Sequence, residues 1–507
     1  MTITTATGPA APQASGAAAL APRVPSRPVE ALWSGLDLIP ALNARVTGGL
    51  PDRVTGVSID TRTLQPGDLF LAIRGVNSDG HAYVAQALDK GAAAAVIDEA
   101  HAAQFHGTGP LYVVKDVLEA LTGLGRAARG RTRGRVVAVT GSVGKTSTKE
   151  ALRMALDAQG RTHASAASYN NQWGVPLSLA RMPRRTQYGI FEIGMNAPGE
   201  VRALSRIVRP HVAIVTTVGP VHLEYFPSVA AIADAKGEIF SGVEPGGVAV
   251  LNRDNDQFER LRAHALASRA GRIVTFGEHE QADVRAEQIV LKPDLSVVEA
   301  SVFGAPVVYR IGSPGRHIAL NSLAVLAAVQ AVGGDLALAA LALGNLAPPE
   351  GRGERIRLSA PGGEFGEPEG AFLLIDESYN ANPSSMTAAL STLGQADVGL
   401  RGRRIAVLAD MLELGEDGPD LHAALNGPIA DNDVDLVFAA GPGMHHLWRA
   451  LAPDVRGAYA ATPAELEGAV LRAVRAGDAV MVKGSNGTKV SRIVAALKNR
   501  FRVAGAR

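Results

Sequence analysis

The stretch Val136-Val-Ala-Val-Thr140-Gly141-Ser-Val-Gly144-Lys145-Thr146 decides the fold of this chain. Its first half is an apolar, β-branched run that predicts a buried strand, and a helical pattern follows from about residue 146 to residue 159. Between them, the glycines let backbone N–H groups turn toward a polyphosphate, and the helix N-terminus adds partial positive charge. Lys145 is suited to neutralise the outer phosphates, and the hydroxyl of Thr146 is suited to bind Mg²⁺. Although Val139 stands where the usual consensus has its first glycine, this strand–loop–helix arrangement predicts a nucleotide site.

Strands and helices alternate from Arg135 to about Pro348, which predicts a doubly wound, parallel α/β sheet. The expected strands of this central domain are 136–140, 189–193, 212–217, 247–251 and 272–276. Leu346-Ala-Pro-Pro-Glu-Gly351 then has the composition of a linker. The alternation restarts beyond it and predicts a C-terminal Rossmann-like α/β domain, with strands at 372–375, 405–408, 436–440 and 479–482.

Apolar runs and one helical stretch precede the phosphate loop and predict a small mixed α/β domain. The runs are 54–59, 69–73, 92–97 and 111–114, and the helical stretch lies near 83–90. The basic stretch from Arg126 to Arg135 indicates a solvated linker rather than a binding patch. We therefore expect a disordered tail rich in Ala, Pro, Ser and Thr, followed by N-terminal, central and C-terminal domains, at 1–28, 29–130, 131–348 and 349–507.

Composition excludes several classes of protein. With 507 residues the chain exceeds what one hydrophobic core usually supports, and its 47% hydrophobic and 20% charged residues are ordinary for a globular protein. The net charge of +1 gives no reason to expect nucleic acid or a membrane surface as a partner, and no apolar run is long enough to span a membrane. The absence of cysteine excludes disulfides and thiolate sites and fits a reducing cytoplasm. We expect a cytoplasmic monomer.

Further sequence segments make the prediction from the phosphate loop more specific. They are Asn170-Asn-Gln-Trp-Gly-Val-Pro176, Phe191-Glu-Ile-Gly-Met-Asn196, Ala235-Lys-Gly-Glu238, Asp376-Glu-Ser-Tyr-Asn-Ala-Asn-Pro383 and Val482-Lys-Gly-Ser485. With them the chain resembles the Mur ligase family from about residue 53 to residue 500. Thr148-Lys-Glu150 and the Ser-Tyr-Asn-Ala-Asn-Pro motif resemble the member that adds D-alanyl-D-alanine. The segments 54–62 and 66–70 are similar to the UDP-binding N-terminal domain of the two late-acting members.

The resemblance implies an ATP-dependent, ADP-forming ligase of peptidoglycan synthesis. A carboxylate is a poor electrophile, because its charge repels an amine and oxide is a bad leaving group. Transfer of the γ-phosphoryl group of ATP makes an acyl phosphate, which an amine can attack to form an amide. Such a transfer mostly needs charge neutralisation and alignment. The implied substrates are D-alanyl-D-alanine and a UDP-N-acetylmuramoyl-tripeptide that ends in diaminopimelate or lysine.

The resemblance also implies the metal and catalytic residues. Two Mg²⁺ ions are expected to bind Thr146, Glu192, His222 and a carbamylated Lys236. The expected catalytic residues are Lys145, Glu192, His222 and Lys236. Glu192 ends an apolar strand, where a carboxylate can reach a metal at the adjacent loop. Considered alone, it would be a solvated strand-end carboxylate, His222 a solvated loop histidine and Lys236 a surface lysine. Carbamylation by CO₂ needs the neutral amine, so burial that lowers the pKa of Lys236 would assist it.

The remaining site residues divide between ATP and the other substrates. The expected ATP contacts are Gly141, Ser142, Val143, Gly144, Lys145, Thr146, Ser147, Asn321, Arg352, Asp376, Glu377 and Tyr379. The expected contacts of the other substrates are Thr61 and Arg62 for UDP, Asn170 and Asn171 in the central domain, and Asn380, Asn382 and Lys483 near the dipeptide. Structural roles stay open for some of them: turn formation for the Asn170–Asn171 pair, a cap for Asn321 and a surface position for Arg62. Arg352 would reach the γ-phosphate only when the domains close, which predicts an open free form and a closed liganded form.

Two other interpretations stay open. A ligase of the same superfamily that adds the third wall residue is expected to carry an Asp-Asn-Pro-Arg motif, which the sequence lacks, and one that adds glutamate to folate is not expected to carry the UDP-type domain. The alternative from another class is a phosphate-loop ATPase or switch that makes no bond. It does not explain Lys236, His222 and the two C-terminal motifs together.

Overall fold

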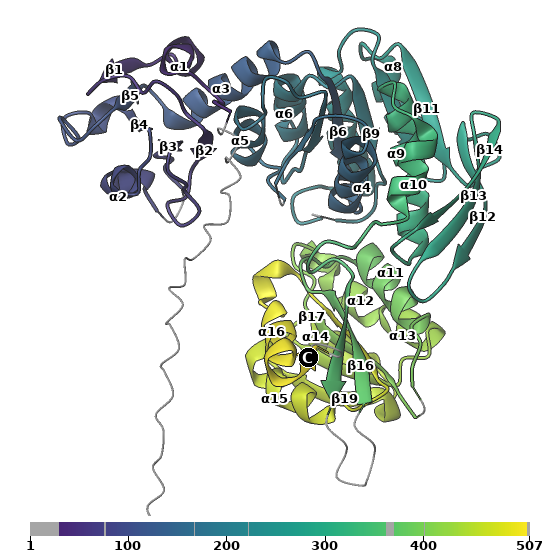
Figure 1. Ribbon diagram of the computed structural model, residues 1–507. Helices are drawn as coiled ribbons and strands as arrows, with labels where there is room; N and C mark the ends of the chain where they lie inside the picture. The colour runs from purple at the N-terminus through teal and green to yellow at the C-terminus, as the bar shows by residue number, and fades with distance from the viewer. Residues whose placement is uncertain are drawn as a thin grey trace, which may run out of the picture.

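The computed structural model describes residues 30–75, 78–166, 168–221, 223–360, 370–399 and 401–503. These residues form three sheets, each with its own helices, which follow one another along the chain (Figure 1). The prediction of a three-domain α/β protein is confirmed. The predicted tail, residues 1–28, lies outside the described residues.

The N-terminal sheet is mixed, as predicted. Its strand order is β1-β5-β4-β3-β2, and neighbouring strands are parallel except for the antiparallel pair of β1 and β5. β3 and β5 are buried along their whole length, as expected for parallel strands that are covered on both faces. The strands are β1 (Arg45–Thr47), β2 (Gly56–Ser58), β3 (Asp68–Leu71), β4 (Ala94–Asp98) and β5 (Leu111–Val114). The helices are α1 (Gly35–Leu42), η1 (Gly80–Tyr83), α2 (Val84–Asp89), η2 (Glu99–His101) and α3 (Val117–Arg131).

The central sheet has the order β14-β13-β12-β11-β10-β9-β6-β8-β7. Neighbouring strands from β7 to β12 are parallel, which confirms the predicted doubly wound sheet. β12, β13 and β14 form an antiparallel meander that was not predicted, because burial alternates along its strands and leaves no continuous apolar run. The strands are β6 (Arg135–Thr140), β7 (Thr162–Ala164), β8 (Tyr188–Glu192), β9 (Val212–Val215), β10 (Val248–Asn252), β11 (Arg272–Gly277), β12 (Val284–Leu291), β13 (Ser296–Val302) and β14 (Ala305–Ile311). The helices are α4 (Lys145–Asp157), α5 (Gly174–Ala180), α6 (Glu200–Val208), α7 (Val229–Gly237), η3 (Glu238–Gly242), α8 (Phe258–Leu266), α9 (Arg316–Ala331) and α10 (Leu336–Leu343).

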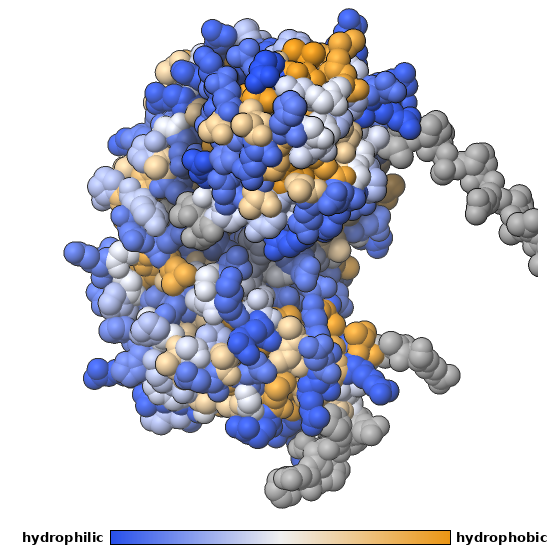
Figure 2. All heavy atoms as spheres, turned by 90° about the vertical axis from the view of Figure 1, so that its left-hand side faces the viewer, coloured by the Kyte–Doolittle hydropathy of each residue, from blue (hydrophilic) through white to orange (hydrophobic). Residues whose placement is uncertain are grey.

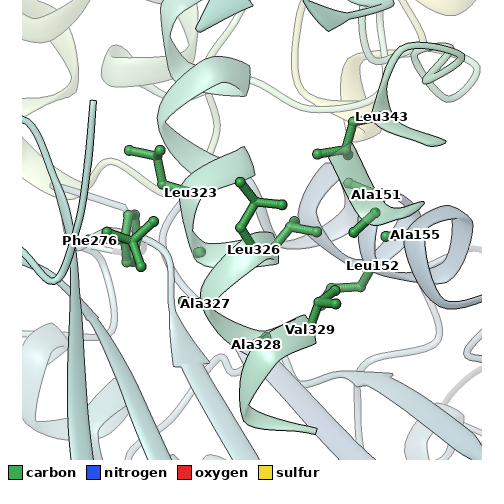
Figure 3. Packing of buried hydrophobic residues seen from close by; sticks show 14 of the residues in the cluster. Ala151, Leu152, Ala155, Phe276, Leu323, Leu326, Ala327, Ala328, Val329 and Leu343 are labelled. Carbon is green, nitrogen blue, oxygen red and sulfur yellow. The ribbon is translucent and has the colours of Figure 1, made fainter. Parts of the chain in front are cut away.

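Helix α9 lies at the centre of the largest core cluster. It is buried almost continuously from Ser322 to Val329, as its apolar sequence requires. Figure 3 shows it between β11, which contributes Phe276, and α4, which contributes Leu152 and Ala155. Burial of each large apolar side chain contributes about 1.5–3 kcal/mol, so this packing holds α9 firmly against the helix of the phosphate loop.

The interpretation of the basic stretch 126–135 as a solvated linker is wrong for its helical part. Residues up to Arg131 belong to α3, and Arg129 is only 4% exposed. Its Nε donates to the carbonyl oxygen of Val208 at 2.8 Å, and its Nη2 donates to that of Arg209 at 2.7 Å. The guanidinium thus satisfies carbonyl groups at the C-terminal end of α6, where positive charge is favoured.

The C-terminal sheet has the order β19-β18-β17-β20-β16-β15-β21. The five strands from β19 to β16 in this order run parallel, as a Rossmann-like sheet requires, and β15 and β21 add an antiparallel edge. The strands are β15 (Glu354–Ala360), β16 (Gly370–Glu377), β17 (Arg404–Ala409), β18 (Leu436–Ala440), β19 (Arg456–Ala460), β20 (Ala479–Lys483) and β21 (Arg502–Val503). The helices are α11 (Pro383–Gly394), η4 (Gly415–Asp417), α12 (Gly418–Ala423), α13 (Asn426–Asp431), α14 (Met444–Ala450), η5 (Pro453–Val455), α15 (Pro463–Ala473), η6 (Asn486–Thr488) and α16 (Ser491–Arg500).

In Figure 1, the N-terminal domain lies to the left of the central domain, and the C-terminal domain lies below the central domain. The central and C-terminal domains touch through a side-chain bond from Arg352 to Ser168 and a backbone bond from Glu224 to Glu413. On the face shown in Figure 2, hydrophilic residues cover most of the surface and apolar residues form small separate patches. Within the described ranges, the helices are too short or too polar to cross a membrane.

Candidate active site

The phosphate loop joins β6 to α4, as predicted. Gly144 precedes the helix with a φ of 82°, a left-handed conformation that suits glycine. A Cβ at this position would lie 2.4 Å from Nδ2 of Asn321, so the glycine also permits the close approach of α9. Asn321 lies inside α9, whose N-cap is Gly315, so it is not the helix cap. Nζ of Lys145 donates to the carbonyl oxygen of Gly141 at 2.7 Å and is folded back over the loop.

Glu192 is the last residue of β8, and it has no exposed surface. β8 is the parallel neighbour of β6, with Glu192 opposite Val139, so its carboxylate lies at the same edge of the sheet as the loop. Its Oε2 accepts a hydrogen bond from Oγ1 of Thr146 at 2.8 Å, and its Oε1 accepts one from Nδ2 of Asn170 at 2.7 Å. The interpretation of Glu192 as a solvated carboxylate is therefore wrong. A buried carboxylate beside a threonine hydroxyl provides oxygen ligands of the kind that Mg²⁺ prefers, so these residues fit this ion.

Lys236, in α7, is 2% exposed, so its interpretation as a surface lysine is wrong. α7 begins after Ser228, whose hydroxyl accepts the N–H of Ala231 and caps the helix. Burial lowers the pKa of Lys236 well below its ordinary value, and the positive charge of Lys145 lowers it further. This environment favours the neutral form of the amine.

Positive charge reaches the phosphate loop from a second domain. Arg352 precedes β15, and its Nη2 donates to Oγ of Ser168 at 3.1 Å while its guanidinium lies 4.2 Å from the centre of the Tyr379 ring. The pKa of Lys145 is lowered by burial and also by Arg352, whereas Glu192 raises it. The positive charge of Arg352 therefore lies close enough to that of Lys145 to repel it, and a bound polyphosphate would offset this repulsion.

The loop before α5 links the phosphate-loop region of the central domain to the C-terminal domain. Ser168 binds the interdomain arginine, and Asn170 binds the buried carboxylate at the phosphate loop. Ser168 was not predicted as a site residue, because its role depends on an arginine from another domain.

Several predicted site residues have structural partners. Oδ1 of Asn171 accepts backbone N–H groups at the start of α5, so this residue forms a turn. Asn382 and Ser385 form a reciprocal capping box at the start of α11. Lys483 is 2% exposed and donates to Oε2 of Glu377 at 3.2 Å. Its Nζ also donates to the carbonyl oxygen of Asn380 at 2.9 Å, so it links a predicted ATP contact to a predicted dipeptide contact.

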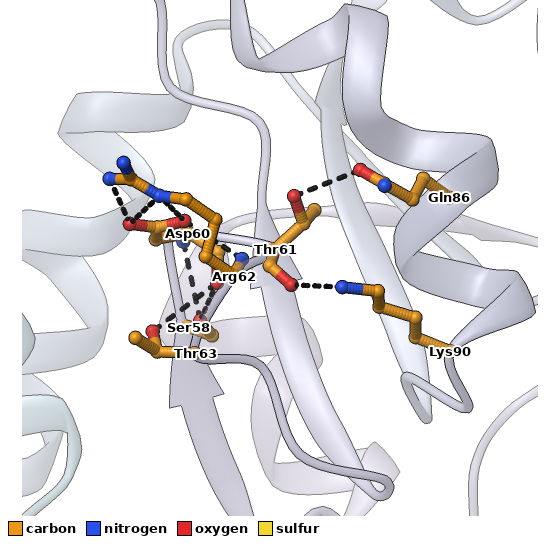
Figure 4. A network of polar contacts seen from close by, with 7 residues as sticks. All are labelled: Ser58, Asp60, Thr61, Arg62, Thr63, Gln86 and Lys90. Carbon is orange, nitrogen blue, oxygen red and sulfur yellow. Dashed lines mark hydrogen bonds and ion pairs between the residues drawn. The ribbon is translucent and has the colours of Figure 1, made fainter.

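The predicted UDP contacts form their own network in the N-terminal domain (Figure 4). Arg62 has a side chain that is 87% exposed and binds Asp60 at 2.6 Å, so its guanidinium is oriented although it faces solvent. Oγ1 of Thr61 donates to Oε1 of Gln86 at 3.0 Å, and Nζ of Lys90 donates to the carbonyl oxygen of Thr61 at 2.7 Å. The surface position that was left open for Arg62 is therefore the one it has in this structure.

Asp376 and His222 were also predicted as site residues. Asp376 lies near the C-terminal end of β16 and is 3% exposed. Its Oδ1 accepts hydrogen bonds from the backbone N–H and the hydroxyl group of Ser378. His222, the predicted second Mg²⁺ ligand, lies outside the described residues, so its role stays a prediction.

Family models match the chain in succession. The catalytic domain of the Mur ligase family matches residues 53–126, the Mur ligase middle domain matches residues 139–329, and the Mur ligase glutamate ligase domain matches residues 365–486. Among curated proteins, the UDP-N-acetylmuramoyl-tripeptide--D-alanyl-D-alanine ligase of Escherichia coli (strain K12) is 34% identical over 77% of this chain and 82% of its own length. The ligase of the same name from Rickettsia prowazekii is 30% identical over 91% of this chain and 99% of its own length.

Solved structures are similar over the same extent. A crystal structure of MurF from Acinetobacter baumannii has a TM-score of 0.80 and 29% identity, and the match covers 93% of this chain and 100% of that one. MurF ligase from Thermotoga maritima in complex with ADP has a TM-score of 0.72 and 24% identity over 88% of this chain and 97% of that one, which shows the shared fold. The three successive domain matches and the length of these similarities show that the chain belongs to the Mur ligase family.

Proposed function

We propose that this protein is an ADP-forming ligase that joins D-alanyl-D-alanine to a UDP-N-acetylmuramoyl-tripeptide and so makes the pentapeptide precursor of peptidoglycan. The observation that carries the proposal is the convergence of the phosphate loop with the buried Glu192 and Lys236 and with Arg352 from the next domain. The relatives described above are named for the same activity, and the similarity covers 99% and 82% of their lengths.

The proposed reaction has two steps. An oxygen of the tripeptide carboxylate attacks the γ-phosphorus of ATP, the bond to ADP breaks, and an acyl phosphate forms. The amine nitrogen of the dipeptide then attacks the acyl carbon, the bond to phosphate breaks, and the nitrogen loses a proton. Lys145 and Arg352 are placed to stabilise the negative charge that both steps spread over phosphate oxygens.

Thr146 and Glu192, together with His222 and a carbamylated Lys236, are the proposed ligands of two Mg²⁺ ions. The bound ions supply charge neutralisation at the phosphate oxygens. Asn170 holds the Glu192 carboxylate in place through its 2.7 Å bond. The fully buried amine of Lys236, whose pKa is lowered, has the neutral form that reaction with CO₂ requires.

The remaining residues bind the substrates in this proposal. ATP contacts the loop residues 141–147 and Asn321, Arg352, Asp376, Glu377 and Tyr379. UDP contacts Thr61 and Arg62, the muramoyl peptide contacts Asn170 and Asn171, and the dipeptide lies near Asn380, Asn382 and Lys483. The domains at 29–130, 131–348 and 349–507 divide these tasks, and the C-terminal one closes on the bound nucleotide. The proposed location of the reaction is the cytoplasm, and the proposed oligomeric state is a monomer.

One assay tests the proposal against its alternatives. Purified protein with ATP and Mg²⁺ is expected to release ADP only when the UDP-linked tripeptide and D-alanyl-D-alanine are both present, with one pentapeptide formed per ADP by mass spectrometry. ADP release without either substrate would favour a phosphate-loop ATPase instead. Ligation of a single amino acid to the UDP-linked dipeptide, or of glutamate to folate, would favour another ligase of the superfamily. Parallel reactions with tripeptides that end in diaminopimelate or lysine identify the third residue.

A further inference from the structure

Six parallel strands of the central sheet, β7, β8, β6, β9, β10 and β11 in spatial order, begin at the same end of the sheet. Their registers place the strand starts beside one another, with Thr162 opposite Tyr188 and Val248 opposite Arg272. Neighbouring strands lie about 4.8 Å apart, so the six starts extend over about 24 Å. The segments that join each preceding helix to its strand are 131–135, 157–162, 180–188, 208–212, 242–248 and 266–272.

These six segments concentrate positive charge. They contain two acidic residues, Asp157 and Glu244, and no lysine. Arg209 pairs with Glu244 at 2.7 Å. Seven further arginines of these segments are exposed, and we call them the arginine row: Arg133, Arg135, Arg161, Arg184, Arg185, Arg269 and Arg272. The net charge of +1 for the whole chain conceals this row, because the sequence distributes over many segments the residues that the fold brings to one end of the sheet.

The acidic neighbours of the row hold it weakly. Arg184 lies 3.7 Å from Asp37, and Arg185 lies 3.6 Å from Glu30. The side chains in both pairs are more than half exposed, and exposed pairs of this kind contribute little to stability. An external anion can therefore replace these two carboxylates.

The arginine row lies at the opposite end of the sheet from the proposed active site. The phosphate loop follows the carboxyl end of β6, and Glu192 ends the neighbouring strand β8. Ser168, which follows the carboxyl end of β7, binds Arg352 of the C-terminal domain. A partner bound to the strand starts therefore leaves the nucleotide site open.

Two exposed leucines lie beside the row. Leu266 is 63% exposed and begins the segment that contains Arg269. Leu36 is 68% exposed and precedes Asp37, the neighbour of Arg184. Cations together with exposed apolar side chains suit a membrane interface, where the cations meet lipid phosphates and the apolar groups enter the boundary of the acyl chains. A nucleic acid would attract the cations but would gain nothing from the leucines.

We propose that the arginine row and the two leucines dock this protein on the surface of an anionic lipid membrane. Guanidinium groups bind phosphate oxygens through paired N–H donors, and the length of the row lets several headgroups bind at once. The inference goes beyond the proposed ligase reaction. It places the protein at the membrane surface with its nucleotide site directed away from the lipid.

Sedimentation of the full-length protein with lipid vesicles tests the proposal. Vesicles of phosphatidylcholine alone are compared with vesicles that contain about one-third phosphatidylglycerol, at about 0.1 M salt. The protein should bind only the anionic vesicles, and added salt should release it. The triple variant Arg133→Gln, Arg135→Gln, Arg161→Gln removes three charges of the row. One arginine near an anionic surface changes the affinity about fivefold, so this variant should bind about 100-fold more weakly.

Two further variants serve as controls. The triple variant Arg357→Gln, Arg449→Gln, Arg492→Gln removes three exposed arginines of the C-terminal domain, and with the same change in net charge it should keep vesicle binding. The double variant Leu36→Gln, Leu266→Gln should weaken vesicle binding about tenfold, because it removes the apolar contacts. All three variants should keep the wild-type melting temperature and rate of ADP release, because the changed residues are exposed and lie outside the proposed active site.

Each outcome bears on the docking surface independently of the ligase reaction, because vesicle binding needs no substrate. No binding to anionic vesicles, or an equal loss in both triple variants, would overturn the proposal. A labelled duplex oligonucleotide is the probe for nucleic acid. Tighter binding of the oligonucleotide than of the vesicles, with no effect of the leucine changes on either, would assign the row to nucleic acid instead. Weaker vesicle binding in the row and leucine variants, with the control triple variant unchanged, supports docking on the membrane.

Discussion

Oγ1 of Thr146 donates a 2.8 Å hydrogen bond to Oε2 of Glu192, whose side chain has no surface exposed to solvent. A carboxylate without solvent is costly unless hydrogen bonds or a cation stabilise it. Thr146 and Asn170 supply one bond to each of its oxygens. These two bonds hold the carboxylate group where Mg²⁺ and the outer phosphates of ATP are expected to meet.

Glu192→Gln tests the need for this charge. The amide keeps the size of the side chain and removes a negative metal ligand, so kcat should fall about 100-fold or more, with a higher Mg²⁺ requirement. ADP release at a series of Mg²⁺ concentrations measures both effects. Glu200→Gln, which changes the same charge at the start of α6, serves as the control and should keep activity. Activity of Glu192→Gln near the wild-type level at low Mg²⁺ would contradict metal binding.

Lys236→Ala should abolish turnover, and added bicarbonate should restore part of it if a carbamate is the group that the site needs. The measurement is ADP release with and without bicarbonate, in buffers depleted of CO₂. Full activity of the Ala variant would remove Lys236 from the mechanism. Lys292→Ala, a change of the same type in the loop between β12 and β13, should leave turnover unchanged.

The buried amine of Lys236 should also make stability depend on pH. Its pKa in the folded protein lies below the ordinary value of 10.5, so between these two values the unfolded chain binds more protons and stability rises with pH. Lys236→Met removes this dependence. In CO₂-free buffer the variant should therefore be more stable than the wild type below pH 10.5. Its advantage in free energy should shrink by up to about 1.4 kcal/mol for each unit of increasing pH within that window. Denaturant unfolding of both proteins at several pH values gives this difference, and an advantage that grows with pH would contradict it.

Gly144→Ala should weaken both the fold and nucleotide binding. A left-handed conformation costs a residue with a Cβ about 1–2 kcal/mol, and the added carbon would lie 2.4 Å from Nδ2 of Asn321. The double variant Gly144→Ala, Asn321→Ala removes the steric conflict and keeps the backbone strain, so it should recover only part of the stability. Thermal unfolding of the single and double variants separates the two terms. Gly130→Ala, which has open space inside α3, should be tolerated.

Arg352→Ala should raise KM for ATP about tenfold and lower kcat, because it removes the cation that the C-terminal domain brings to the phosphate loop. Arg357→Ala, an exposed arginine in β15, is the matched control. Small-angle scattering of the wild type should show a smaller radius of gyration when nucleotide and substrates are added, and a reduced change in Arg352→Ala. Identical wild-type profiles with and without ligands would contradict closure.

Local patterns account for the parts of the fold that were predicted well. The apolar run before Gly141 is a strand and the segment after Lys145 is a helix, because both depend on neighbouring residues and on the turn between them. Glu192 was placed correctly at a strand end for the same reason. The meander of β12 to β14 was missed, because alternating burial gives short apolar signals, and the basic stretch around Arg129 was misjudged, because its carbonyl partners lie about 80 residues away in the chain.

The sequence alone determined the chemistry that this protein offers: a phosphate loop, a carboxylate at the end of the adjacent strand, a lysine in a capped helix and the motifs of the Mur ligase family. Only the tertiary structure decided which groups are buried and which meet. Burial gives Lys236 its lowered pKa, and the contact of two domains brings Arg352 to Ser168. Desolvation and charge interactions depend on distance in space, and segments far apart in the chain come close only when the domains pack together.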